Sequence, residues 1–285
     1  MRNAAKPSLV ALLCLLVSAK VAAAADFEIS GFGGYTFPFY SQTFTYGPGP
    51  ISIDVANINI TQSGSFELKA SGAAAFGGAL AFYPTHAIGI EVRLDSSDLK
   101  LKPQASTFDV DVTLPAPFEP IHSSLTLDQG TASLKPANSF SINLRVRTGG
   151  QTHLFASGGL SHLGNLEASI HQPVALGVTS VDLIHDKINV GTIDLQAQVP
   201  LDQQGSSWGG NFGLGFQIGL GQHGGVFVEG RGFVFPKRRT EWSGVIESPL
   251  SPLEQQLLDR LLSSLPQAEV KPWWVQATIG ISYRF

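Results

Sequence analysis

Alternation of apolar and polar residues is the main pattern of this chain, and it is clearest over residues 273–285. Counted back from Phe285, every second residue is apolar or aromatic, whereas the positions between them are mostly polar or glycine. Successive side chains of a β-strand point to opposite faces, so this alternation predicts a strand with one apolar face. Trp274 is the one clearly hydrophobic residue on the otherwise polar face.

Seven further segments show the same period of two. They cover residues 27–37, 73–82, 87–95, 139–147, 152–162, 211–220 and 226–235. Three of the connections between neighbouring segments are short and rich in turn-forming residues, at 83–86, 148–151 and 221–225. The other four are long, at about 38–71, 96–137, 164–207 and 236–271. Short and long connections therefore alternate strictly along the chain.

This alternation of connection lengths is typical of a transmembrane β-barrel. We predict an all-β fold, an eight-stranded antiparallel transmembrane β-barrel over residues 26–285, with short periplasmic turns and four long outer loops. A soluble β-sandwich would also supply eight alternating strands, but it does not account for the regular change between short and long connections.

The first 25 residues are typical of a secretory signal peptide. Arg2 and Lys6 precede a short apolar run, and small residues at Ala23 and Ala25 resemble a cleavage site. We expect cleavage after Ala25 and export to the bacterial outer membrane. An uncleaved membrane anchor is the alternative, but the apolar run is too short to span a bilayer.

Composition excludes several classes of site. The single cysteine, Cys14, lies in the predicted signal peptide, so residues 26–285 offer neither a disulfide framework nor a thiolate metal site. Removal of three basic residues with the signal leaves 18 − 3 = 15 basic against 22 acidic residues, a net charge of −7. This acidic balance argues against nucleic-acid binding. No cofactor and no metal site is expected.

The chain resembles the small eight-stranded outer-membrane barrels, namely the transmembrane domain of OmpA, OmpX and the opacity-type surface proteins. The resemblance covers the architecture of residues 26–285, and the ending Tyr283-Arg284-Phe285 is similar to the signal that the barrel-assembly machinery reads in this family. It implies contact with outer-membrane lipids and an assembly signal at Tyr283 and Phe285. The long loops resemble no particular member.

If the apolar faces meet lipid, the polar faces line the lumen. The charged residues on those faces are Glu28, Glu91, Arg93, Arg145, Arg147, Glu229, Arg231 and Arg284. Eight strands enclose a space that side chains can just fill, so these groups could form a salt-bridged core. Glycines on the same faces, among them Gly77, Gly215 and Gly280, leave room for the alternative of a narrow ion path lined by arginines.

The four long loops make up more than half of residues 26–285, and parts of them alternate again, as in "ISIDVANINI". We expect their strands to continue beyond the membrane as extended hairpins. In the last loop, Ser251, Pro252 and Glu254 predict the start of a short helix that ends near Leu265. Its leucine stripe could cover the barrel mouth or the hairpins, or it could lie on the outer leaflet.

A basic stretch follows strand 226–235. Lys237, Arg238 and Arg239 could pair with lipopolysaccharide phosphates at the loop end of the barrel. The alternative is an ordinary solvated rim.

Signals for catalysis are weak. A lipid A deacylase would carry a serine two residues after its histidine, but Gly164 stands at that position after His162. Asp95-Ser96 matches a palmitoyltransferase only as a dipeptide. His153 and Ser157 have the wrong spacing, and "DLIHD" offers metal-ligand residue types only. We expect no enzyme. The favoured function is display of the loops to an unknown extracellular partner, and the alternatives are a narrow channel and a lipid A-modifying enzyme.

Overall fold

The computed structural model describes residues 26–47, 51–53, 58–117, 119–134, 137–164, 167–182, 187–198, 206–245 and 249–285. The predicted signal peptide therefore lies outside the described residues. Within the described ranges, no helix is both long and apolar enough to cross a membrane.

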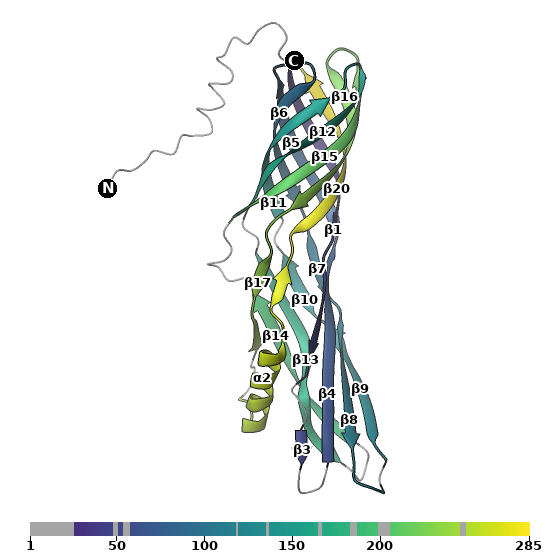
Figure 1. Ribbon diagram of the computed structural model, residues 1–285, viewed down its shortest axis with the longest axis vertical. Helices are drawn as coiled ribbons and strands as arrows, with labels where there is room; N and C mark the ends of the chain where they lie inside the picture. Colours follow the sequence, from purple (N-terminus) through teal and green to yellow (C-terminus); the bar gives the residue numbers. More distant parts are fainter. Residues whose placement is uncertain are drawn as a thin grey trace, which may run out of the picture.

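Eight strands form a closed antiparallel barrel, which occupies the upper half of Figure 1. Around the barrel the strands follow the order β1, β20, β16, β15, β12, β11, β6 and β5. Their bounds are β1 Asp26–Pro38, β5 Ala73–Tyr83, β6 Ile88–Ser97, β11 Ala137–Arg147, β12 Thr152–Leu163, β15 Ser207–Leu220, β16 Gly224–Val234 and β20 Trp273–Arg284. Pairing of the first strand with the last closes the barrel. The predicted eight-stranded barrel is confirmed.

The outer wall of the barrel is apolar. Leu214 and Ile279, for example, keep 57% and 60% of their surface exposed although the opposite faces of their strands are buried. Aromatic side chains lie exposed toward both ends of this apolar belt, namely Phe27, Tyr283 and Phe285 at the end with short turns and Phe39, Trp208 and Trp273 at the end with long loops. An apolar belt with aromatic girdles is typical of a barrel surrounded by lipid.

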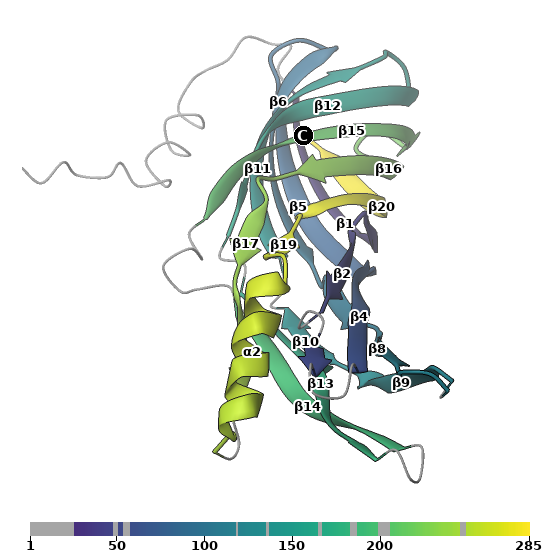
Figure 2. The same cartoon turned by 60° about the horizontal axis from the view of Figure 1, so that its bottom comes forward.

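The long loops fold into an outer domain beyond the barrel (Figures 1 and 2). One sheet contains β2 Ser41–Tyr46, β4 Ile58–Ser71, β8 Ala105–Thr113 and β9 Ile121–Gln129, with β3 Ile51–Ile53 and β7 Lys100–Pro103 also paired to β4. A second sheet contains β10 Thr131–Leu134, β13 Ala168–Asp182, β14 Lys187–Gln198 and β18 Trp242–Val245. A separate pair is formed by β17 Arg238–Thr240 and β19 Ala268–Val270. The strands do continue beyond the barrel, but as parts of sheets rather than as separate hairpins.

The outer domain has its own hydrophobic core. Apolar side chains from both sheets meet in one cluster, in which Phe44, Leu68 and Phe108 are fully buried. The Phe44 ring stacks on Phe66 at a centroid distance of 4.8 Å and meets Trp242 edge-on at 5.2 Å. Burial of this kind is what holds a domain together, so these loops are packed structure rather than extended connections.

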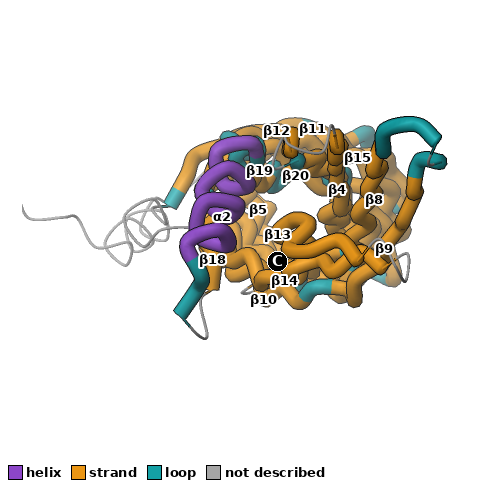
Figure 3. The backbone as a smooth tube through the Cα atoms, turned by 90° about the horizontal axis from the view of Figure 1, so that it is seen from below, coloured by secondary structure: helices purple, strands orange, loops and turns teal. Residues whose placement is uncertain are grey.

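The predicted helix is α2, Pro252–Ser264. Ser251 caps it, and Glu254 reaches back to the Ser251 backbone to complete a capping box. Its leucines are buried against the outer domain, among them Leu257, Leu258 and Leu261, and the helix lies along one side of the domain in Figure 3. The helix therefore packs on the sheets. The alternative of a helix lying on the outer leaflet is wrong, because the same leucines are already covered.

Loss of this cap should destabilise the outer domain measurably. Ser251→Ala removes the hydrogen bond to the Glu254 backbone and should lower the free energy of unfolding by about 1 kcal/mol. Hydrogen bonds from the backbone and side chain of Ser251 hold the pKa of Glu254 below its usual value. The contribution of that carboxylate is therefore present above the ordinary carboxyl pKa and is lost as the pH falls through the lowered one. Urea unfolding followed by tryptophan fluorescence at neutral and acidic pH checks both expectations.

The matched control for the cap is Gln256→Ala, an exposed position of the same helix. It should change stability by less than about 0.5 kcal/mol at either pH. Equal effects of the two substitutions, or a Ser251→Ala effect that grows in acid, would contradict the role of the capping box.

Candidate functional site: the barrel lumen

All eight charged residues expected in the lumen lie on the inner faces of the barrel strands, and only Arg284 keeps appreciable exposure, at 31% of its side chain. The structure adds two carboxylates to this set. Asp95 is buried beside Arg93, and Asp26 binds Arg147 at 2.8 Å. Three glutamates and two aspartates then face five arginines, so the charges balance. Asp95 lies on the same face of its strand as Glu91 and Arg93, so the alternation of the sequence could have predicted its place in the lumen.

Arg231 lies at the centre of this network and is completely buried. Its Nη2 atom lies 2.9 Å from Glu91 Oε1 and 2.7 Å from Glu229 Oε1. Arg93 continues the network from Glu229, at 2.5 Å, to Asp95, at 2.9 Å. Buried charges are tolerated only when paired and hydrogen-bonded. Here Arg231–Glu229 and Arg93–Asp95 pair within a strand, whereas Arg231–Glu91 and Arg93–Glu229 join β16 to β6.

Toward the end with short turns, the network continues through Arg145. Its Nη1 atom lies 3.1 Å from Glu91 and 3.4 Å from Glu28. Glu28 is shared among three arginines at 3.4 to 3.6 Å, namely Arg145, Arg147 and Arg284. The ion pairs thus form one continuous chain from the turn end to the middle of the barrel.

Aromatic rings cover the guanidinium groups. The Arg93 guanidinium lies 3.8 Å from the centroid of Phe32, and that of Arg145 lies 4.0 Å from Phe155. Arg147 lies over Tyr83 at 3.6 Å. Such contacts stabilise desolvated cations, since the face of an aromatic ring is electron-rich.

The glycines that could have left an ion path are instead filled by these rings. A Cβ atom on Gly77 would lie 2.4 Å from Phe32, and one on Gly215 would lie 2.2 Å from Phe155. Phe227 covers Gly280 in the same way, at 2.4 Å. Each phenylalanine therefore needs a glycine on a neighbouring strand in order to lie flat inside the barrel.

At the loop end, an aromatic layer covers the lumen. Trp274 stacks between Phe233 and Phe235, with centroid distances of 5.2 Å to each, and Leu99 and Leu163 complete the layer. This explains why a hydrophobic residue interrupts the polar face of the last strand. Between this layer and the charges lie hydroxyl and amide groups, which bond to one another, as in Asn211–Asn143, Asn211–Ser161 and Gln276–Ser97.

The basic stretch lies in the outer domain beside an acidic residue. Lys237 and Arg239 pair with Glu269 at 3.4 and 2.9 Å, and Arg238 lies between them in β17. Burial would raise the pKa of Glu269, but hydrogen bonds from Arg239 and Lys237 hold it below its usual value. A contact of these three basic residues with lipopolysaccharide stays a prediction.

Tyr283 and Phe285 lie at the turn end of the barrel on its apolar outer surface. Their rings meet edge-on at a centroid distance of 5.0 Å, and His223 stacks on Tyr283 at 5.6 Å. Both side chains are exposed to the space that lipid would fill. Their role as an assembly signal stays a prediction.

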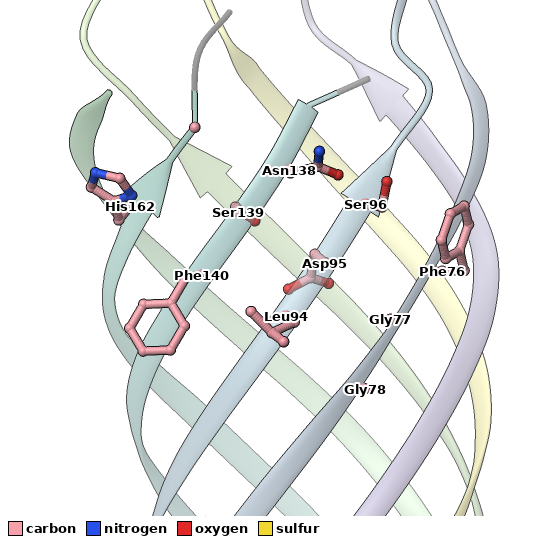
Figure 4. A pocket seen from close by; sticks show the side chains of 11 residues that line it. Phe76, Gly77, Gly78, Leu94, Asp95, Ser96, Asn138, Ser139, Phe140 and His162 are labelled. Carbon is pink, nitrogen blue, oxygen red and sulfur yellow. The ribbon is translucent and has the colours of Figure 1, made fainter. Parts of the chain in front are cut away.

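The residues considered for catalysis do not come together. A cavity of about 370 Å³ on the outer wall near the loop end is lined by Ser96 and His162, among others (Figure 4). These two lie on β6 and β12, with β11 between them, so their strands are about 10 Å apart. Asp95 is bound to Arg93, and Ser157 accepts a hydrogen bond from Arg231.

Metal ligands do not gather in the described part of the chain, where no group of three histidines, cysteines or carboxylates could hold an ion. Of the "DLIHD" sequence, His185 and Asp186 lie outside the described residues.

No known protein family matches the sequence. No curated protein matches it either. Solved structures with a similar fold include three outer-membrane proteins. The outer membrane protein OprG from Pseudomonas aeruginosa is 14% identical, with 92% of this chain and 96% of that chain covered and a TM-score of 0.41. The N-terminal β-barrel domain of Pseudomonas aeruginosa OprF is 10% identical, with 91% and 97% covered and a TM-score of 0.34.

The third solved structure is the outer membrane protease OmpT from Escherichia coli, at 12% identity, with 92% and 97% covered and a TM-score of 0.35. Similarities of this size carry no argument about what the present chain does. Its assignment as an eight-stranded barrel rests on the strand pairing itself.

Proposed function

We propose that this chain is an outer-membrane anchor that displays a folded domain on the cell surface, where the domain contacts an extracellular partner. The observation that carries the proposal is the filled lumen. A continuous chain of ion pairs and an aromatic layer occupy the barrel, so its interior serves stability rather than transport. What remains free to act is the outer domain.

Balanced charge in the lumen supports this proposal. An ion path lined by arginines needs guanidinium groups that are free to bind a passing ion. Here each arginine of the network is held by carboxylates, and the central one, Arg231, has no exposed surface. An entering ion would have to break these buried ion pairs first. Leaving a buried charge without its partner costs about 3–5 kcal/mol.

The packed outer domain also supports it. Binding surfaces are commonly built on loops that a rigid scaffold holds in place. The two sheets and α2 share one core, so the exposed faces of the outer domain are fixed relative to the barrel strands that continue into them. The same proposal includes three further contacts. The apolar belt contacts lipid, Lys237 to Arg239 contact lipopolysaccharide, and the assembly machinery recognises Tyr283 and Phe285.

Surface display can be tested with single cysteines in the chain from residue 26 onward, which has none of its own. Ser63→Cys lies on the exposed face of β4, and Gln222→Cys lies in a short turn at the opposite end of the molecule. A membrane-impermeant maleimide should label Ser63→Cys on intact cells and Gln222→Cys only after the outer membrane is permeabilised. The reverse pattern, or labelling of both on intact cells, would overturn the proposal.

A further inference from the structure

One strand of the outer domain keeps an open edge. β9 is the last strand of its sheet, paired with β8 on one side, and no other described strand pairs with its second side. It lies at the margin of the molecule in Figures 1 and 2. An open edge presents unpaired backbone N–H and C=O groups and can add another strand.

The other sheet edges of the outer domain are protected. Beside β2, the Gln42 side chain accepts a hydrogen bond from the Glu269 backbone and donates one to Gln267 O. The edge strands β10 and β18 of the second sheet are each only four residues long. β9 is longer, contains no lysine, arginine or proline, and its one bulge lies at Asp128 near its end. Lysine, proline and bulges are the usual devices that prevent edge pairing. β9 has no lysine or proline, and its bulge leaves residues 121–127 in regular pairing with β8.

The sequence of β9 complements itself. When two copies pair antiparallel about Leu125, His122 of each comes opposite Asp128 of the other, the bulge residue, and both side chains are exposed. On the inner face, Leu125 meets its counterpart and Leu127 meets Ser123. These apolar residues are only half-buried and already pack on the edge of the core, so a partner strand would cover the rest of their surface. An imidazole directly opposite a carboxylate can donate a hydrogen bond to it across the strand pair.

The symmetry of this pairing fixes how the two molecules face. Antiparallel edge strands in one continuous sheet are related by a two-fold axis perpendicular to that sheet. β9 runs roughly along the long axis of the molecule (Figure 1). Rotation by 180° about the two-fold axis, which is perpendicular to the sheet, therefore points the second barrel in the opposite direction. The two barrels then lie in two facing membranes rather than side by side in one.

The outer domain is long enough for this arrangement. Leu125 lies about 13 Å from the start of β9, which is next to the tip of the domain. In Figure 1 the barrel lies toward the other end of β9, beyond β7 and β10. The two tips therefore overlap beside the symmetry axis, whereas the two barrels lie on opposite sides of it.

We propose that the open edge of β9 binds β9 of a second copy of this chain anchored in a facing membrane, so that the protein tethers two membranes by itself. This rests on the proposed surface display. Pairing extends the sheet across the two molecules and places His122 between Asp111 of its own sheet and Asp128 of the partner.

The first test uses two populations of proteoliposomes that carry different dyes and contain the refolded chain from residue 26, with Leu125→Cys as its only cysteine. Mixed vesicles should cluster, and mild oxidation should produce a disulfide-linked dimer that contains one chain from each population. Ser63→Cys, exposed on a central strand of the same sheet, should cluster the vesicles without cross-linking. No clustering by fully folded protein, or equal cross-linking of both variants, would overturn the proposal.

The second test exchanges the His122–Asp128 pairs. His122→Asp alone places two pairs of aspartates across the symmetric contact, and Asp128→Lys alone removes both carboxylates that face His122, so vesicles bearing either variant should cluster about tenfold less. Vesicles of one variant mixed with vesicles of the other should cluster again. In that mixed contact the introduced aspartate lies opposite the introduced lysine, and the unchanged Asp128 of one chain lies opposite the unchanged His122 of the other.

Rescue by mixing cannot arise from misfolding, because each variant alone would carry the same defect into the mixture. Failure of rescue with both variants folded and surface-exposed would overturn the tethering while leaving surface display intact.

Discussion

Replacing Arg231 with alanine should lower the free energy of unfolding of the barrel by about 3–5 kcal/mol. The substitution leaves Glu91 and Glu229 buried without the guanidinium that bonds both of them. Removing one partner of a buried ion pair costs far more than the pair itself contributes, because an uncompensated charge remains in a low-dielectric site. The urea midpoint of the refolded protein in lipid vesicles, followed by its heat-modifiable gel mobility, measures the loss.

The matched control is Arg239→Ala in the outer domain. Arg239 also bonds a carboxylate, Glu269, at 2.9 Å, but 63% of its side chain is exposed. Exposed pairs contribute about 0–1 kcal/mol, so this substitution should have little effect. Equal losses for the two variants would mean that the lumen network is hydrated and does not hold the barrel closed.

The second large effect is expected at Phe44. Its ring is fully buried between Phe66 and Trp242, so Phe44→Ala should lower the free energy of unfolding of the outer domain by about 3–5 kcal/mol. The barrel network is not touched, so the barrel should stay folded while the outer domain becomes sensitive to protease. Trp242 fluorescence and limited proteolysis of the vesicle-embedded protein report the outer domain, and gel mobility reports the barrel.

Thr43→Ala is the control for Phe44→Ala, because Thr43 lies next to it on β2 with its side chain exposed. It should leave both readouts within about 0.5 kcal/mol of the original protein. If Phe44→Ala unfolds barrel and outer domain together, or if it leaves the protease pattern unchanged, the outer domain does not have the separate core described here.

The barrel could be predicted because its signal is local. Alternation assigns each residue of a strand to lipid or lumen, so the positions of Arg93, Arg145 and Glu229 inside the barrel followed from counting along single strands. The same counting left the use of the lumen open. Whether Gly215 leaves a gap in the lumen or is covered by an aromatic ring depends on Phe155 of the neighbouring strand. The register that places Phe155 beside Gly215 cannot be read from the sequence of either strand alone.

The outer domain could not be predicted beyond its strands and helix. Its sheets join segments from different loops, as when β14 pairs with β18 and β4 pairs with both β7 and β8. Alternation marks such strands as half-buried but does not say which partner covers them. Helix α2 was the exception, because the capping residues Ser251 and Glu254 and the leucine stripe are local signals.

The central claim is that the barrel is closed and serves as an anchor. Planar-bilayer conductance of the refolded chain from residue 26 tests it most directly, with Arg145→Ala and Glu229→Ala beside it. We expect no steady current from the heat-modifiable, folded protein, because the ion pairs and the layer around Trp274 fill the lumen. A steady, ion-selective current that these two substitutions alter would contradict the account and would make the lumen the functional site.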